Sequence, residues 1–452
     1  MKTSASRSGR SPVCFFNMAR ARHLKIFRVS RATARVLGAG HPWILPDAES
    51  DDPAGFRPGS LVQVVGPRSR ELGWARIEGR GRIAARMWAP AGSTPDGDAQ
   101  EVDLRVESAV QKRKNLLERG SSRRWSDSEV YTDALRVIHG EADGLPGLSV
   151  DLLGPLVRVG ISGGASAGLL ASLVRSLESR FPDLGIEGRP PWVEVRYQAD
   201  GAKADRSAVR WRELPPAIWL KENLDDASRV RVRERGLSFA VDPGLLEPLR
   251  PRPGVGLFLD QRENRARLAR RAERERGTWL NLFAHTGAFS VALLASGAER
   301  VVSVDLSAAY LAWLQANLEL NFPDPADRAR HESVRKEGRR YMASLEADEE
   351  FAGIVLDPPT AASAGRQYWS IKRDLEPLVG DCLARLKSGG VLLVSRNDRF
   401  SPGALRELVE RIARRRHVEL LRVEITGPGP DFPRINGFRE GDPFCGVLAQ
   451  RF

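Results

Sequence analysis

Residues 279–394 constrain the fold of this chain most strongly, because short apolar runs alternate there with stretches of helical periodicity. The expected strands are Trp279–Phe283, Val301–Asp305, Ile354–Leu356 and Val391–Val394, and the expected helices include Ala288–Ser296 and Ser307–Leu320. Strands that alternate with helices form parallel sheets, because a parallel connection needs a crossover long enough to hold a helix. Residues 243–452 are therefore predicted to form a Rossmann-like, doubly wound α/β domain.

Two further domains are expected ahead of this one. Residues 23–95 contain short apolar strands separated by Gly and Pro turn signals, which predicts a small β-rich domain. Residues 101–242 begin with a charged helical stretch and continue with alternating strands, which predicts a linker helix and a central α+β domain. Residues 1–22 are basic and Ser-rich and lack the apolar core of a signal peptide, so a disordered tail is expected. Met18 is an alternative start to Met1.

The charge of the chain points to a polyanionic partner. The net charge is +12, and only nine of the 70 basic residues are lysine. Arginine presents planar, bidentate donors that match phosphate groups and guanine edges, so RNA or DNA is the expected partner. A GC-rich genome, which favours arginine codons, is the alternative explanation for the same excess.

The expected compartment follows from apolar runs and cysteines. No apolar run approaches the ~20 residues of a membrane span, so no membrane partner is expected. Cys14, Cys382 and Cys445 are odd in number and far apart, which argues against a disulfide framework and a cysteine-based metal cluster. A cytoplasmic protein without a bound metal is therefore expected.

A glycine turn followed by an acidic strand end is the first candidate binding motif. Gly287 lies between the strand ending at Phe283 and the next helix, where the missing side chain lets a ligand approach the backbone. Asp305 ends the following strand, and an acid there can accept hydrogen bonds from both ribose hydroxyls of a nucleoside. The motif is not GxGxxG, which favours a nucleoside without phosphates. The structural alternative is that Gly287 serves packing and Asp305 caps the next helix.

Asp357-Pro-Pro-Thr360, directly after the buried strand Ile354–Leu356, is the second candidate motif. Pro358 and Pro359 fix the backbone beyond the strand end and hold the preceding carboxylate in one orientation. Ligands of doubly wound sheets bind at the carboxyl ends of the strands, so this acid can face a flat polar ring such as a nucleobase. The alternative is a rigid turn with an exposed aspartate.

Together these motifs resemble class I S-adenosylmethionine-dependent methyltransferases that modify large-subunit (23S) ribosomal RNA and carry an N-terminal PUA domain. In the α/β part the resemblance is carried by Phe258–Arg265, Leu280–Gly287, Val304-Asp305 and Asp357–Thr360. Further upstream, Gly40-His-Pro-Trp43 is similar to the start of the PUA domain, and Glu141–Leu148 to the central domain. The resemblance implies a methyltransferase that acts on large-subunit ribosomal RNA or its precursor.

The resemblance also assigns site residues by position. The positions expected to hold the cofactor, S-adenosylmethionine, are Phe258, Asp260, Arg262, Asn281, Phe283, Thr286, Gly287, Asp305 and Glu337. Those expected to face the methyl group and the target base are Asp357, Pro358, Pro359 and Thr360. Within the cofactor set, Asp305 is expected at the ribose. Glu337 stands where the family usually has Asp near the adenine amino group, so its longer side chain is a departure.

A second departure bears on the chemistry. The ribosomal 5-methylcytosine enzymes of this architecture have a cysteine just after the strand that follows the Asp-Pro-Pro motif. Cytosine C5 is a poor nucleophile, so a thiolate must add at C6 before the methyl transfer. Here that strand ends in Val394-Ser-Arg-Asn397, without a cysteine.

The residues at this point instead resemble the guanine-N7 branch of large-subunit rRNA methyltransferases. Guanine N7 has an in-plane lone pair, so direct in-line transfer can supply most of the catalysis. Asn397 is then expected beside the base, and Arg396 and Arg434 are expected to bind the RNA, the latter within a C-terminal segment that also resembles this branch. Two alternatives stay open. One is cytosine C5 methylation through a displaced cysteine (Cys382 or Cys445), and the other is a non-catalytic, cofactor-binding RNA assembly factor.

Overall fold

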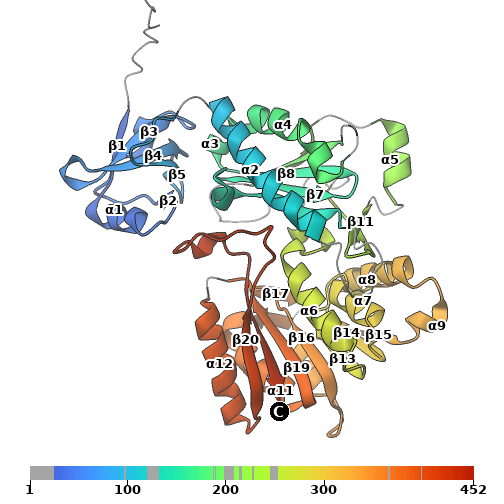
Figure 1. Cartoon of the computed structure of the whole chain (residues 1–452). Helices are drawn as coiled ribbons and strands as arrows, with labels where there is room; N and C mark the ends of the chain where they lie inside the picture. The colour runs from blue at the N-terminus through green and yellow to red at the C-terminus, as the bar shows by residue number, and fades with distance from the viewer. Residues whose placement is uncertain are drawn as a thin grey trace, which may run out of the picture.

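The computed structural model describes residues 25–95, 98–119, 132–186, 188, 190–197, 208–212, 216–225, 229–244, 253–364, 367–398 and 400–452. The expected N-terminal tail, with Cys14 and Met18, lies outside the described residues. Figure 1 shows three successive bodies along the chain, coloured blue, cyan to green, and yellow to red. Among the described helices, none is both long and apolar enough to cross a membrane.

The N-terminal domain is a five-stranded sheet with one helix. In sheet order its strands are β1 (Ile26–Arg28), β3 (Leu61–Val65), β4 (Glu71–Ile77), β5 (Ala85–Pro90) and β2 (Trp43–Ile44). Alternate residues of a strand face the same side, so Val62 and Val64 enter the core together with Phe27 and Ile44. Partly buried residues of α1 (Arg31–Gly38) pack against this core. The β-rich N-terminal domain predicted from the turn signals is confirmed.

The middle domain packs helices on a mixed sheet. In sheet order its strands are β10 (Ala208–Trp211), β9 (Trp192–Tyr197), β8 (Leu156–Ser162), β7 (Leu148–Leu153) and β6 (Ala134–His139). Strands β8 and β9 run parallel, and the other neighbours are antiparallel. The helices are α2 (Asp98–Arg119), α3 (Gly164–Ala167), α4 (Leu170–Glu178) and, later in the chain, α5 (Ala217–Asn223). Val102, Val106 and Leu173 of α2 and α4 are buried in the core of this domain.

A two-stranded hairpin links the middle domain to the last one. Its strands are β11 (Val230–Glu234) and β12 (Leu237–Val241), which pair only with each other among the described strands. The middle domain predicted from the sequence extends to residue 242 and so includes this hairpin. Asn317 Oδ1 accepts a hydrogen bond from Ala240 N, and Trp313 Nε1 donates to Ala240 O, so β12 is held by helix α8 (Ala308–Asn321). The hairpin therefore packs on the α/β domain as well as on the sheet of the middle domain.

The C-terminal domain is the doubly wound sheet predicted from the sequence. In sheet order its strands are β15 (His331–Arg335), β14 (Arg300–Asp305), β13 (Thr278–Leu282), β16 (Phe351–Leu356), β19 (Leu386–Arg396), β21 (Cys445–Arg451) and β20 (Leu420–Thr426). The first five strands run parallel, and β21 and β20 add to the edge in antiparallel fashion. From β13 the chain adds β14 and β15 on one side, and it then returns to add β16 and β19 on the other side, so the strand order reverses between β13 and β16. A crevice for a ligand forms at the carboxyl ends of strands at such a switch point.

Helices cover both faces of this sheet (Figure 1). They are α6 (Arg262–Ala272), α7 (Ala288–Ala295), α8, α9 (Pro325–Arg328), α10 (Gly338–Met342), α11 (Ile371–Ala384) and α12 (Pro402–Arg415), with a small hairpin of β17 (Ala361–Ala364) and β18 (Gln367–Ser370) before α11. Trp279 of β13 packs in one core with residues of α6, α7 and α8. Its neighbour Leu280 packs in a second core with α10, α11 and α12. Both cores are apolar, as expected for a parallel sheet buried on its two faces.

Within the middle domain, a buried ion pair joins α2 to the turn that follows β6. Arg113 lies between Lys112 and Lys114 in the charged helical stretch, yet it is not exposed. The guanidinium of Arg113 is fully buried and donates to both carboxylate oxygens of Asp143 at 2.7 and 2.9 Å. One face of an α-helix points inward every third or fourth residue, so a charged run need not be exposed throughout.

This ion pair predicts a measurable difference in stability. Asp143→Asn should lower the free energy of unfolding of the full chain by ~3–5 kcal/mol, because it leaves a buried guanidinium without its counter-charge. Asp183→Asn is the matched control: Asp183 pairs with Lys114 of the same helix at 3.1 Å, but both side chains are exposed. The control should cost at most ~1 kcal/mol. Denaturant titration of both variants measures the difference, and equal losses would contradict this account of the buried pair.

Candidate active site

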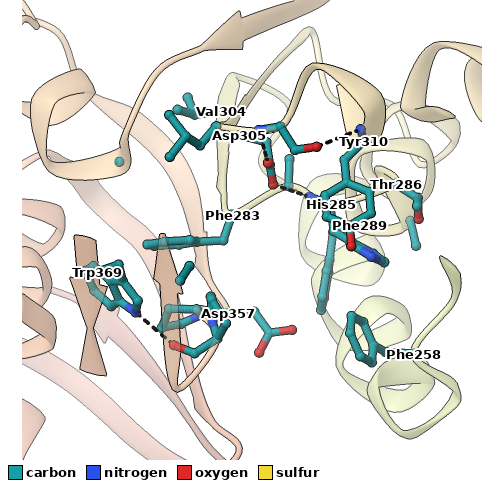
Figure 2. A pocket seen from close by; sticks show the side chains of 18 of the residues that line it. Phe258, Phe283, His285, Thr286, Phe289, Val304, Asp305, Tyr310, Asp357 and Trp369 are labelled. Atoms are coloured by element: carbon teal, nitrogen blue, oxygen red, sulfur yellow. Dashed lines mark hydrogen bonds between the residues drawn. The ribbon is translucent and has the colours of Figure 1, made fainter. Parts of the chain in front are cut away.

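A large cavity opens at the carboxyl ends of β13, β14 and β16, where the switch point predicts a ligand site. Its volume is about 790 Å³. Of the residues predicted from the sequence, those that line the cavity are Phe258, Asp260, Phe283, Thr286, Asp305, Glu337, Asp357, Pro358, Pro359 and Asn397. Figure 2 shows the side chains of Phe283, Asp305 and Asp357 around this space. The cavity therefore brings together most of the two candidate motifs.

The turn after β13 has an unusual backbone. Phe283, His285 and Gly287 all have positive φ angles, of 58°, 52° and 79°. A Cβ at Gly287 would lie 2.3 Å from Leu314 Cγ, so this glycine is also required by the packing against α8. The packing alternative for Gly287 is thus supported, and the residue itself does not line the cavity. The sequence motif indicated an unusual backbone conformation at Gly287 but not at Phe283 and His285. At these two positions a positive φ costs more free energy, because each residue carries a Cβ.

Asp305, the last residue of β14, is hydrogen-bonded to this turn. Its Oδ2 accepts a hydrogen bond from His285 N and its Oδ1 one from Ser307 N, each at 2.8 Å (Figure 2). Burial raises the pKa of Asp305 above its ordinary value. The two bonds fix the carboxylate at the cavity wall, while further lone pairs on both oxygens remain for a ligand. The capping role and a binding role are therefore compatible.

Aromatic rings make up much of the wall. The His285 ring lies between Phe258 and Tyr310, with centroid distances of 5.1 and 4.3 Å (Figure 2). Burial lowers the pKa of His285 to about 4, so its ring is neutral at physiological pH. On the opposite side Phe283 packs on Trp369 at 4.7 Å between centroids. A flat, uncharged ligand part such as a purine is suited to this lining. Tyr310 and Trp369 were not predicted as site residues.

Two carboxylates lie at the base of the cavity. Burial and the neighbouring carboxylate of Asp260 raise the pKa of Asp357 to about 7. Burial likewise raises the pKa of Asp260 to about 6, an effect that the charge of Arg265 opposes. Trp369 Nε1 donates to Pro359 O at 2.8 Å, which holds the proline turn in place. Perturbed acids of this kind, facing a cavity, are typical of functional sites.

Asn397 faces the cavity from the end of β19. Thr360 Oγ1 donates to Asn397 Oδ1 at 2.6 Å, so the Asp-Pro-Pro-Thr turn and the end of β19 are joined by their side chains. Thr360 is exposed and lies outside the cavity lining.

Four other predicted residues also lie outside the cavity, because each side chain is held elsewhere. Arg262 is buried and binds Asp431 and Ala134 O, and Asn281 is buried and donates to Ser290 Oγ at 2.8 Å. Arg396 pairs with Asp398, and its guanidinium lies 3.7 Å from the ring centroid of Phe400. Arg434 lines a second cavity instead. No cluster of three or more potential metal ligands occurs in the described part of the chain.

Two protein-family models match this chain. Residues 207–446 match the family described as S-adenosylmethionine-dependent methyltransferase, and residues 27–90 match the PUA-like domain. The first match begins ahead of the hairpin of β11 and β12, in agreement with the packing of that hairpin on the α/β domain. The two matches together span the N-terminal sheet and the whole of the cavity.

Curated relatives cover most of the chain. Ribosomal RNA large subunit methyltransferase I of Salmonella arizonae is 28% identical over 366 residues, which are 81% of this chain and 82% of the relative. The protein of the same name from Citrobacter koseri is 28% identical over 354 residues, 78% of this chain and 80% of the relative.

Solved structures show the same fold. The methyltransferase SMU.776 complexed with SAH aligns with a TM-score of 0.73 over 94% of this chain and 100% of its own, at 20% identity. A SAM-dependent methyltransferase from Streptococcus mutans aligns with a TM-score of 0.70 over the same shares, also at 20% identity. Since the family match covers more than half of the residues, this chain belongs to the S-adenosylmethionine-dependent methyltransferases, and its cofactor is S-adenosylmethionine.

Proposed function

We propose that this methyltransferase acts on a base of large-subunit ribosomal RNA, at guanine N7, by direct in-line transfer of the methyl group. The observation that carries the proposal is the pairing of a proline-fixed carboxylate turn with Asn397 at the cavity, in a site where no accessible thiol lies among the described residues. The RNA substrate is supported by the names of the curated relatives, by the PUA-like domain and by the net charge of +12.

The lining of the cavity fits S-adenosylmethionine. When bound, this cofactor supplies a methyl group on a positively charged sulfur. Asp305 binds the ribose hydroxyls with the lone pairs that His285 N and Ser307 N leave free. The aromatic wall receives the adenine ring. Glu337 caps α10 by accepting from Arg339 N and Arg340 N, both at 3.1 Å, and its carboxylate faces the cavity near the place of the adenine amino group.

The assignment of Asp305 predicts a large loss of cofactor affinity in Asp305→Ala. Two charge-assisted hydrogen bonds to the ribose vanish, each worth ~1.5–3 kcal/mol, so the Kd for S-adenosylhomocysteine should rise by ~10²-fold or more. Asp348→Ala removes an exposed acid of the same domain and should leave the Kd unchanged. Isothermal calorimetry on both folded variants measures the two values. An unaltered Kd in Asp305→Ala would remove this acid from the cofactor site.

The carboxylates of Asp357 and Asp260 line the part of the cavity that we assign to the methyl group. In the free protein the pKa of Asp357 is about 7 and that of Asp260 about 6, so both are largely protonated at pH 5.5 and largely ionised at pH 8. A positively charged ligand binds the ionised form better and therefore releases protons when it binds. A neutral ligand of the same shape has no such preference.

This linkage predicts different pH dependences for two nearly identical ligands. S-adenosylmethionine carries the sulfonium charge and S-adenosylhomocysteine does not, while the rest of the two molecules is the same. The affinity ratio in favour of S-adenosylmethionine should rise severalfold from pH 5.5 to 8. Asp357→Asn should flatten that rise. A ratio that does not change with pH in the wild-type protein would place both carboxylates away from the methyl group.

The cysteines bear on the choice between guanine N7 and cytosine C5. Cys445 pairs with Arg396 in the register of β21 and β19, so its backbone lies near the site. However, its side chain is 4% exposed, and burial raises the pKa of its thiol to about 11. Cys382 of α11 is fully buried in the apolar core that α10, α11 and α12 form against the sheet, and burial raises the pKa of its thiol strongly. A thiolate nucleophile is therefore disfavoured at both positions, whereas direct transfer to N7 needs none.

Methyl transfer to large-subunit ribosomal RNA is the test of the proposed function. Nucleoside mass spectrometry of the product should identify 7-methylguanosine, and Cys382→Ala and Cys445→Ala should each retain methyl transfer. Asp357→Ala should lower turnover by ~10²-fold or more, because the base loses its in-line position. 5-Methylcytidine in the product, or an adduct with 5-fluorocytosine RNA that disappears in a cysteine variant, would favour cytosine C5. No transfer to any ribosomal RNA would contradict the proposal as a whole.

A further inference from the structure

A second cavity lies where the three domains meet. Its volume is about 310 Å³. Trp43 lines it from the N-terminal domain, and Arg136 from the middle domain. Arg434 and Asp442 line it from the C-terminal loop, which we define as residues 427–444 between β20 and β21. Pro443 lines both this junction cavity and the cofactor cavity, so the two spaces share a wall.

The C-terminal loop is fixed in place by contacts with both upstream domains. In Figure 1 it is the red segment that reaches from the catalytic sheet toward the blue and cyan domains. The fully buried Asp431 accepts from Arg136 N of the middle domain at 3.1 Å. Phe438 packs edge-on against His41 and Trp43 of the N-terminal domain, with centroid distances of 5.3 and 4.8 Å. The junction cavity is therefore pre-formed, which lowers the cost of ordering when a ligand binds.

The polar groups of the junction cavity include a carboxylate that is ion-paired but incompletely hydrogen-bonded. Asp442 Oδ1 is buried and accepts no hydrogen bond in the described part of the chain, although Arg434 Nε lies 3.2 Å away as an ion pair. Burial raises the pKa of Asp442, in keeping with a carboxylate that lacks full solvation. Beside it, Arg434 Nη2 donates to Phe444 O at 3.2 Å. A carboxylate acceptor next to a guanidinium donor matches a nucleobase edge, which presents a donor beside an acceptor.

We propose that the junction cavity binds an unpaired nucleotide of the RNA substrate that neighbours the target base, with Asp442 and Arg434 on its base edge. The proposal rests on the proposed function, since it places a second nucleotide of the same RNA. A volume of about 310 Å³ is large enough for one nucleotide and too small for a duplex. Sequence-specific proteins commonly read such splayed-out bases of single-stranded RNA by their edges and by aromatic stacking. The shared wall at Pro443 puts the two nucleotides in adjacent cavities.

The test combines a protein variant with a change in the RNA. The substrate is a short RNA around the nucleotide that the wild-type protein methylates, with each flanking base in turn replaced by an abasic nucleotide. One abasic position should raise the KM of the wild-type protein about tenfold or more, because a charge-assisted base contact is lost. Asp442→Asn should raise the KM for the intact RNA by a similar factor and be insensitive to that same abasic position, since two changes at one contact do not add.

Controls separate this proposal from other causes. Asn436→Ala removes an exposed polar side chain of the same loop that does not line the cavity, and it should keep the wild-type response to the abasic RNA. Arg434→Gln should behave like Asp442→Asn, and both variants should keep their calorimetric affinity for S-adenosylhomocysteine. Equal effects of the abasic position in wild type and in Asp442→Asn would overturn the junction-cavity proposal. A wild-type protein that methylates no ribosomal RNA would instead overturn the proposed function.

Discussion

The buried carboxylate of Asp431 is the contact on which the arrangement of this enzyme depends. It binds Arg262 of the catalytic domain and a backbone N–H of the middle domain, and the carbonyl of the same residue accepts from Arg113 at 2.8 Å. Loss of the acid would leave buried donors without partners, which is far more costly than a missing surface pair. Because the C-terminal loop continues to Pro443 and Phe444 in the cofactor cavity, this contact also positions one wall of the active site.

The sequence predicted the catalytic sheet and the carboxyl-end location of the site, because both depend on local periodicity and on chain order. It also predicted Asp305 and Asp357 as acids at strand ends, and both line the cavity. It did not predict that the β11–β12 hairpin belongs with α8, since an isolated alternating strand does not indicate which domain it will join. Packing between elements far apart in the chain decided that outcome.

Some of the predicted site residues lie outside the cavity because another part of the protein holds their side chains. Arg262 was expected at the cofactor but is held by Asp431, 169 residues later in the chain. Conversely, Tyr310 belongs to no motif that the sequence offered, and it lines the cavity where the positive-φ turn brings the His285 ring to 4.3 Å from its own, centroid to centroid. Local signals identify a position at which a ligand can bind, whereas the partner that competes for a given side chain is known only from the fold.

In the reaction that we propose, the contributions of Asp357 divide between binding and rate. In direct transfer to a ring nitrogen, the positive charge passes from sulfur to the base, so a carboxylate beside both interacts with the charge before and after the transfer. Such uniform attraction improves affinity without lowering the barrier of the chemical step. In the proposed reaction the effect of Asp357 on the rate must then come from its orientation of the base, for which Pro358 and Pro359 hold the carboxylate in place and Trp369 secures the turn through Pro359 O. In this proposal the two prolines matter for the rate as much as the acid does, since the turn that they fix aligns the bound base with the methyl group.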